Sequence, residues 1–301
     1  MADSSNALVR LDGGLATELQ RAGVTLREPW WTTGVLRVET DRRRLSDIHQ
    51  RYLAAGAQVI TANTFRTNLR TLRQTDLDPA GQAWMVHAAI GVAMAARNLA
   101  GTGRTRIVAS VAPVEDCYRP DLVPSDEELR AEHAWLATEL SRSGVQHVLI
   151  ETMNTTREAL IALEEAQKTG MRAWVSFVCD DEFSLLSGES LAAAATAVER
   201  AGADAVLVNC APLAQTEGSI RVLRDAVSLP VGAYPNLEDR SGSPRWQHVE
   251  RVFPVAVEPP AFAETAHRWH TELGARIIGG CCGSTPDHIA ALSAANLTRV
   301  G

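Results

Sequence analysis

Three of the five cysteines in this 301-residue chain follow short apolar segments, at points where a buried strand would end. Cys210 follows Ala205–Asn209, and the adjacent Cys281 and Cys282 come shortly after Arg276–Ile278. Adjacent cysteines rarely form a disulfide, because the ring is strained and the two side chains diverge. Three thiolates with one open position are typical of a catalytic zinc, since a structural zinc normally has four protein ligands. The spacing leaves two interpretations open, namely a zinc site or free cysteines that simply pack.

A zinc ion on three thiolates favours thiol chemistry over hydrolysis. Such a soft site prefers another sulfur ligand, and coordination lowers the pKa of a thiol by several units from about 8.5. Hydrolysis by zinc-bound water would need imidazole ligands and a nearby general base. The pattern therefore indicates alkylation of a thiol. Cys117 and Cys179 have no second cysteine nearby in the sequence, and we expect them to pack in the core.

The elements that must position these cysteines follow a repeating pattern, in which a helical segment ends at a glycine and a short β-branched segment follows. Each glycine suits the left-handed position that ends a helix, and each apolar segment has the length of a buried strand. The glycines of this pattern are Gly56, Gly144, Gly170, Gly202 and Gly274. The expected strands are Leu8–Leu11, Gln58–Thr61, Ile107–Ala112, His147–Glu151, Ala173–Val178, Ala205–Asn209, Val231–Tyr234 and Arg276–Ile278.

Segments of helical periodicity lie between these strands, for example Glu127–Ser143, Thr156–Thr169 and Phe262–Leu273. Alternating strands and helices predict a parallel sheet, and eight units predict a (β/α)8 TIM-type barrel. We expect a single α/β domain over residues 1–301. An open doubly wound sheet is the alternative, but no G-x-G-x-x-G sequence follows the first strand.

In a barrel, the carboxyl ends of the strands gather at one face, where the active site lies. Polar residues or glycines follow most of the expected strands at this end, although any strand must exit into a polar loop. The residues concerned are Asp12, Gly13, Asn63, Thr64, Glu151, Cys210, Cys281 and Cys282.

Composition excludes several classes of protein. The net charge of −7 and pI near 5.7 argue against nucleic-acid binding. No apolar segment approaches the length of a membrane span, and Met1–Arg10 has no signal-peptide pattern. The low, odd number of cysteines favours a reducing compartment, so we expect a cytoplasmic protein.

Taken in order, several stretches of the sequence resemble those of the homocysteine S-methyltransferase family of zinc-dependent (β/α) barrels. They are LDGGLATEL, ITANTF, LIETM, VNC, YPN and IIGGCCGSTPDHI. The resemblance implies zinc bound by Cys210, Cys281 and Cys282. It also implies that Glu151 meets the amino group of homocysteine, and that Asp12, Gly13, Asn63 and Thr64 lie near the amino acid.

The resemblance further implies a sulfonium methyl donor, because the chain carries no cobalamin or folate module. The sequence does not decide between S-methylmethionine and S-adenosylmethionine as the donor. The loop after YPN differs from that of many relatives, since Leu237, Glu238 and Asp239 replace a small residue and a glycine. The expected reaction is direct transfer of the methyl group to a thiolate, with no acid–base residue strictly required.

Two other functions remain open. The first is a related zinc-thiolate alkyltransferase that acts on another small thiol or on a selenol. The second is a thiol redox sensor that uses Cys281 and Cys282 as a reversible pair. We interpret the adjacent Trp30 and Trp31 as a packing element rather than a cation–π site for the donor.

Overall fold

The structure is a computed structural model, and it describes residues 7–241 and 253–297. Eight strands alternate with helices along the chain. The strands are β1 (Val9–Arg10), β2 (Val59–Ala62), β3 (Arg106–Val111), β4 (His147–Met153), β5 (Arg172–Phe177), β6 (Ala205–Pro212), β7 (Val231–Asn236) and β8 (Ile277–Ile278). The α-helices are α1 (Leu15–Arg21), α2 (Glu39–Ala54), α3 (Leu69–Leu72), α4 (Pro79–Leu99), α5 (Asp126–Arg142), α6 (Thr156–Lys168), α7 (Leu191–Arg200), α8 (Leu213–Ala226), α9 (Pro259–Leu273) and α10 (Pro286–Leu297). Two short 3-10 helices are η2 (Thr32–Arg37) and η3 (Pro120–Leu122).

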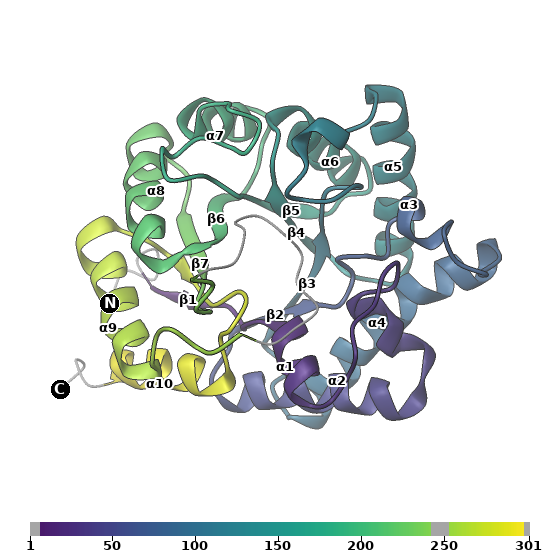
Figure 1. Cartoon of the computed structure of the whole chain (residues 1–301), viewed down its shortest axis with the longest axis horizontal. Coiled ribbons are helices and arrows are strands. Elements are labelled where there is room, and N and C mark those ends of the chain that lie inside the picture. Colours follow the sequence, from purple (N-terminus) through teal and green to yellow (C-terminus); the bar gives the residue numbers. More distant parts are fainter. Residues whose placement is uncertain (1–6, 242–252, 298–301) are drawn as a thin grey trace.

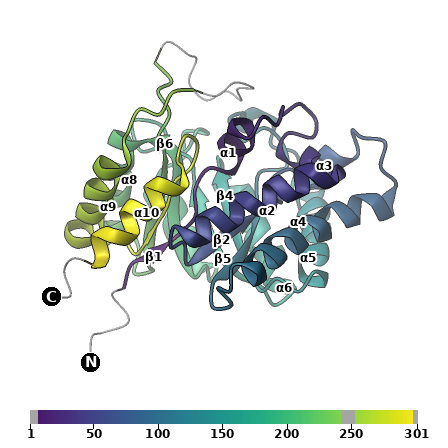
Figure 2. The same ribbon diagram turned by 90° about the horizontal axis from the view of Figure 1, so that it is seen from below.

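The strands form a parallel barrel, as the sequence predicts. Their order is β1-β8-β7-β6-β5-β4-β3-β2, and a parallel bridge between Leu11 and Val59 joins the two ends. The helices surround the ring of strands (Figure 1), and the side view shows them packed along its outside (Figure 2). The barrel expectation is thus confirmed, and the open sheet is wrong.

The glycine pattern is confirmed as well. All five glycines that were expected to end helices have positive φ angles, from 73° at Gly274 to 95° at Gly56. Other helix boundaries also follow local chemistry. A capping box of Ser125 and Glu128 starts α5, and the Thr155 hydroxyl caps α6. Large apolar side chains such as Tyr52, Phe177 and Trp269 fill the space between the helices and the sheet.

The barrel interior has an apolar floor and a polar upper layer. The floor includes Val108 of β3, Leu149 of β4 and Leu207 of β6. Because side chains alternate along a strand, residues two positions further on also point inward. These residues are Ser110, Glu151 and Asn209. Ser176 likewise follows Trp174 of the floor, and Tyr234 packs in the floor itself while its hydroxyl reaches the polar layer; all of these residues are buried. The polar layer therefore lies at the carboxyl ends of the strands, directly above the apolar floor.

Within the described part of the chain, none of the helices combines the length and the apolar character that crossing a bilayer requires.

Close packing of β7 against β8 generates the first prediction. A Cβ atom at Gly232 of β7 would lie 2.3 Å from the backbone oxygen of Ile277, whereas one at Gly91 of α4 would meet no atom within 4 Å. We expect Gly232→Ala to lower the free energy of unfolding by about 2 kcal/mol or more. Gly91→Ala, the matched control, should raise it by about 0.5–1 kcal/mol. Urea unfolding measures both, and similar effects of the two substitutions would contradict the packing described here.

Candidate functional site

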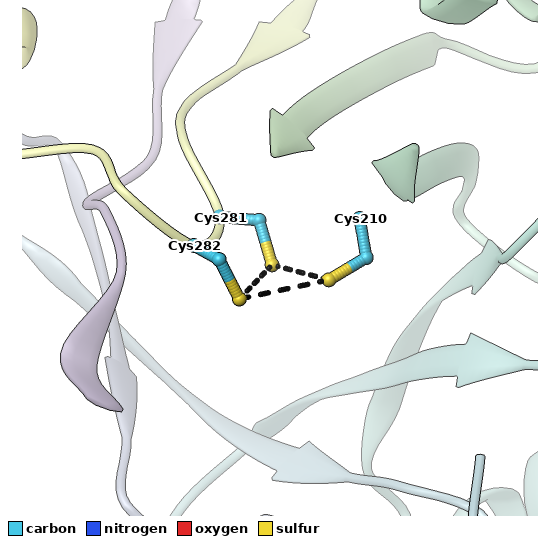
Figure 3. A group of neighbouring side chains, drawn as sticks. All are labelled: Cys210, Cys281 and Cys282. Carbon is cyan, nitrogen blue, oxygen red and sulfur yellow. Dashed lines mark hydrogen bonds between the residues drawn. The ribbon is translucent and has the colours of Figure 1, made fainter. Parts of the chain in front are cut away.

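The three predicted cysteines meet at the mouth of the barrel. Cys210 extends from β6, Cys281 and Cys282 extend from the segment after β8, and their sulfurs point toward one another (Figure 3). The Sγ of Cys210 lies 2.9 Å from that of Cys281 and 3.9 Å from that of Cys282, and the Cys281 and Cys282 sulfurs are 4.0 Å apart. Among the described residues, this is the one group of three or more potential ligands close enough to share a metal ion.

An irregularity in β6 turns Cys210 toward the mouth. Asn209 points into the barrel, so in a regular strand the next side chain would point outward to the helices. Instead, the pairing of β6 with β7 shifts register between Asn209 and Pro212, and Cys210 takes a left-handed conformation with φ of 61°. Such a conformation is uncommon for a residue other than glycine and costs about 1–3 kcal/mol. The strand thereby directs Asn209 into the buried polar layer and Cys210 into the cavity.

The Asn209 side chain holds this irregular region. Its Oδ1 accepts hydrogen bonds from the Thr152 backbone N–H at 3.0 Å and the Ser176 hydroxyl at 2.7 Å. Its Nδ2 donates to the Thr152 hydroxyl at 2.8 Å. Thr152 is itself left-handed, with φ of 58°, at a register shift in β4. One buried amide therefore links the irregular ends of β4 and β6 across β5.

Glycines allow the tight turn that carries the other two cysteines. A Cβ at Gly280 would lie 2.3 Å from the Ser284 side chain, and one at Gly283 would lie 2.8 Å from the backbone nitrogen of Glu238. Backbone hydrogen bonds connect the same turn to the end of β7, since Cys281 donates to Pro235 and Leu237 donates to Cys282, both at 2.8 Å. The turn and the segment after β7 are thus packed as one unit.

The three sulfurs lie within hydrogen-bonding distance of one another, and in both contacts of Cys210 either thiol can be the donor. Hydrogen bonds with Cys281 and Cys282 lower the pKa of Cys210 well below its ordinary value. The same interaction with Cys210 raises the pKa of Cys282 to about 12 and that of Cys281 well above its ordinary value. The Tyr118 hydroxyl also donates to Cys210, at an oxygen–sulfur distance of 3.6 Å. These shifts arise from the close approach of the three sulfurs.

A buried carboxyl group lies in the same cavity. Ser110 donates a short hydrogen bond to Oε1 of Glu151, and the Tyr234 hydroxyl donates to Oε2 at 3.2 Å. Burial raises the pKa of Glu151 to about 7, although both hydrogen bonds oppose the shift. The Glu151 carboxyl group is thus held in one orientation and becomes easier to ionise when a cation approaches.

Asp12 has a structural role that its sequence position did not reveal. Its Oδ2 accepts from the Thr61 backbone N–H at 2.7 Å, and its Oδ1 accepts from the Thr61 hydroxyl at 3.0 Å. Burial raises its pKa to about 7, against the opposing effect of these bonds. Asp12 therefore connects β1 to β2, where the barrel closes, and also lines the cavity.

The remaining predicted contacts divide into two groups. Gly13 and Asn63 line the cavity, and the Asn63 amide also donates to the Thr32 carbonyl at 2.9 Å. Thr64 is fully buried outside the cavity lining, and its hydroxyl donates to the Ser110 carbonyl at 2.7 Å. Thr64 therefore supports the strand that carries Ser110 rather than facing the cavity.

The loop after β3 covers one side of the site. Cys117 is buried as expected, but it also lines the cavity. Buried groups fix this loop, because the Asn154 amide donates to the Cys117 carbonyl at 3.0 Å and Val114 donates to Glu158 at 2.8 Å. Cys179 is buried after β5 and does not line the cavity.

The two tryptophans differ in their surroundings. Trp30 packs beneath the Arg37 guanidinium at 4.5 Å, away from the cavity. Trp31 lines the cavity and makes an edge contact with Phe65, with ring centroids 5.3 Å apart. Trp30 is thus a packing residue, as expected for both tryptophans, whereas Trp31 forms an aromatic wall of the cavity together with Phe65.

Sequence reasoning missed several residues of the site. In the sequence, Ser110 and Ser176 appear only as parts of apolar strands, yet both donate hydrogen bonds within the polar layer. A serine at an inward-pointing position of a buried strand indicates such a hydrogen-bonding role. Glu238 and Arg240 also line the cavity, and they lie in the segment after β7.

Comparison with known proteins agrees with the site. Residues 9–296 match the family model described as homocysteine S-methyltransferase. Homocysteine S-methyltransferase YbgG of Bacillus subtilis is 28% identical, with 95% of this chain and 94% of that protein aligned. Selenocysteine Se-methyltransferase of Brassica oleracea is 27% identical, with 94% and 87% aligned. The crystal structure of the metallated homocysteine methyltransferase MmuM from Escherichia coli has a TM-score of 0.81 at 27% identity and covers 95% of this chain and 96% of that one.

Burial of Glu151 predicts an unusual dependence of stability on pH. Its pKa is raised from 4.5 to about 7 in the folded protein. Its contribution to stability is therefore fully present below about pH 4.5 and is lost as the pH rises through 7. We expect metal-free Glu151→Gln to be more stable than the metal-free wild type at pH 8, by up to about 3 kcal/mol, and to resemble it near pH 4. Urea unfolding across this range measures the difference.

The matched control is Glu264→Gln, on the exposed face of α9. Its effect should be small and nearly constant with pH. A Glu151→Gln advantage that grows toward low pH would show that the carboxyl group is not destabilised by burial.

Proposed function

The chain belongs to the homocysteine S-methyltransferase family, and from this premise we propose that it transfers a methyl group from a sulfonium donor to homocysteine, giving methionine. The observation that carries the proposal is the convergence of three sulfurs from two distant segments beside a buried carboxyl group. We further propose that the metal is zinc and that Cys210, Cys281 and Cys282 bind it.

The sulfur positions fit zinc. A Zn–S distance of about 2.3 Å in a tetrahedral site corresponds to sulfur–sulfur distances of roughly 3.8 Å. The two distances that involve Cys282, 3.9 and 4.0 Å, already have this value. The third, 2.9 Å between Cys210 and Cys281, must widen when the metal binds. Three cysteines leave one position for a substrate sulfur.

When bound, zinc supplies a thiolate nucleophile at neutral pH, because it lowers the pKa of the acceptor thiol. In the overall reaction, a bond forms between the acceptor sulfur and the methyl carbon as the bond from that carbon to the donor sulfur breaks. The donor leaves as a neutral thioether, and the thiol proton of homocysteine is released to solvent. No side chain has to protonate the leaving group.

The proposed role of Glu151 is to bind the ammonium group of homocysteine. An ammonium group would pair with its carboxylate, while Ser110 and Tyr234 keep that carboxylate in place. Asp12, Gly13 and Asn63 are proposed to surround the amino acid at the same end of the cavity. Thr64 is proposed to act indirectly, by supporting Ser110.

Other residues shape the region that the donor would occupy. Trp31 and Phe65 present an aromatic wall to the cavity, and Leu15 and Ala16 add apolar surface. Such a wall suits the positive charge of a sulfonium, which a ring face attracts by about 0.5–2 kcal/mol. Together with the apolar residues, it would also restrict water near the reacting atoms.

A selenol is the second acceptor that we consider, because one relative of nearly full length is named a selenocysteine Se-methyltransferase. The chemistry at a soft three-sulfur site is the same for both acceptors. All five cysteines are free thiols, which fits a protein that works in a reducing compartment, and we propose the cytoplasm.

The metal proposal is tested by Cys281→Ser. We expect wild-type protein, purified under reducing conditions, to hold about one zinc per chain and to form methionine from homocysteine and S-methylmethionine or S-adenosylmethionine. The variant should lose both the zinc and the activity, because two thiolates bind zinc far less tightly than three. Elemental analysis and a methionine assay give the two readouts.

Cys179→Ala is the control, because this cysteine is buried after β5 and does not line the cavity. It should keep both zinc and activity. An active, zinc-free Cys281→Ser variant would refute the proposal, and reduced wild-type protein without zinc would favour the redox sensor.

The role of Glu151 is tested by kinetics. We expect Glu151→Gln to raise the KM for homocysteine by about 10- to 100-fold with a much smaller change in kcat, because a charged hydrogen bond to the ammonium group is lost. Steady-state kinetics measure both constants. In a separate assay, homocysteine and selenocysteine compete as acceptors, and the ratio of their kcat/KM values shows which one the site prefers. A Glu151→Gln variant with unchanged KM but reduced kcat would assign Glu151 to another role.

A further inference from the structure

Arg240 is the one positively charged side chain among the described residues that line the cavity. The same lining contains the carboxyl groups of Asp12, Glu151 and Glu238 and the three thiols of the cysteine cluster. A substrate with a carboxylate would therefore meet mainly acidic groups in this cavity. Arg240 is the side chain that can attract such a group by its charge.

Glu238 fixes the position of the Arg240 guanidinium. Its Oε2 accepts a hydrogen bond from Nε of Arg240 at 2.8 Å and forms an ion pair with Nη2 at the same distance. The Glu238 side chain is only 2% exposed, whereas that of Arg240 is 23% exposed. On another side, the guanidinium carbon lies 5.5 Å from the ring centre of Phe253. A long side chain is thus held in one orientation before any ligand arrives, which reduces the entropy lost on binding.

The backbone around Glu238 is fixed as well. Its N–H donates to Oδ1 of Asn236 at 2.8 Å, and the residue forms an antiparallel bridge with Val255. The backbone N–H of the neighbouring Leu237 donates a hydrogen bond to the Cys282 carbonyl, so the segment is attached to the cysteine turn. The position of Arg240 is therefore coupled to the position of the thiols.

The geometry assigns Arg240 to the donor rather than to the acceptor. In an amino acid, one carbon separates the ammonium group from the carboxylate, so an acceptor whose ammonium group is bound by Glu151 keeps its carboxylate nearby. Glu151 lies within β4, in the polar layer of the barrel. Arg240 follows the end of β7 by four residues, on the segment that is attached to the cysteine turn. Glu151 lies within a strand and Arg240 lies beyond the end of one, so we assign the acceptor to the level of Glu151 and the donor to the level of Arg240.

We propose that Arg240 is the donor-binding residue of this chain, and that its guanidinium recognises the carboxylate of an amino-acid sulfonium donor while Glu238 holds it in place. The inference rests on the proposed methyl transfer, and it goes further by naming the chemical group that the donor must carry. Glu238 is a positioning residue in this scheme.

The test combines a change in the enzyme with the matching change in the donor. The two donors are S-methylmethionine and (3-aminopropyl)dimethylsulfonium, which differ in the carboxylate. We expect Arg240→Met to lower kcat/KM for S-methylmethionine by about 10- to 100-fold, because the charged hydrogen bonds are lost. The same variant should use the donor without a carboxylate as well as the wild type does, within about twofold. Arg240→Lys should fall in between, since an ammonium group keeps the charge but not the planar fork.

Controls separate this role from others. Arg119→Met removes an exposed arginine that pairs with Asp121 in the loop after β3, outside the cavity lining, and it should behave as wild type. Zinc content and the KM for homocysteine should stay unchanged in Arg240→Met. If that variant does not fold, Glu238→Gln keeps the guanidinium but weakens its support, and it should reduce use of S-methylmethionine selectively.

Each contrary outcome has a distinct meaning. Equal losses with both donors, or a raised KM for homocysteine, would overturn the assignment of Arg240 to the donor carboxylate. Loss of zinc from Arg240→Met would show instead that Arg240 balances the charge of the thiolates. If the wild type uses S-adenosylmethionine instead, that donor and its decarboxylated form make the same comparison. Failure of the wild type with every sulfonium donor would count against the proposed function itself.

Discussion

The left-handed backbone at Cys210 is the constraint on which the cluster of three cysteines depends. A regular β6 would send this thiol to the outer side of the barrel, because Asn209 already points inward. The unfavourable conformation persists because the Asn209 amide makes three hydrogen bonds, two to Thr152 and one to Ser176. Those bonds are buried, so breaking them would leave polar groups unpaired in the barrel. Strain at one residue is thus offset by a network that spans three strands.

The buried carboxyl groups of the polar layer lower the stability of the fold but strengthen the binding of a cation. Burial of Glu151 and Asp12 raises the pKa of each to about 7, so their ionised forms are unfavourable in the folded state. The same burial strengthens any interaction of Glu151 with an ammonium group, because fewer water molecules compete for it. A site that binds a charged amino acid is therefore less stable without its ligand. The carboxyl groups that we propose to surround the amino acid are thus the same ones whose ionisation lowers the stability of the fold.

The sequence predicts the barrel and the positions of the cysteines because both depend on short-range patterns. Glycines at helix ends and apolar segments mark the strands, and the ends of parallel strands must meet at one face. The roles of Asp12 and Thr64 could not be predicted in this way, since they depend on partners in neighbouring strands. Thr64 follows β2 like a site residue, yet it faces Ser110 of β3. The orientation of Cys210 toward the mouth could not be predicted from the sequence either, because a register shift in a strand has no simple residue pattern.

The tight contact between Gly283 and Glu238, with the bond from Leu237 to Cys282, has a consequence for how such enzymes diversify. The loop that contains Arg240 also supports the turn that contains two of the thiols. A loop exchanged from a relative would fit only if its first residues lay equally close to this turn. Evolution or engineering of new substrate preference in this scaffold must therefore keep the backbone of Leu237 and Glu238 in place, because the cysteine turn is packed against it.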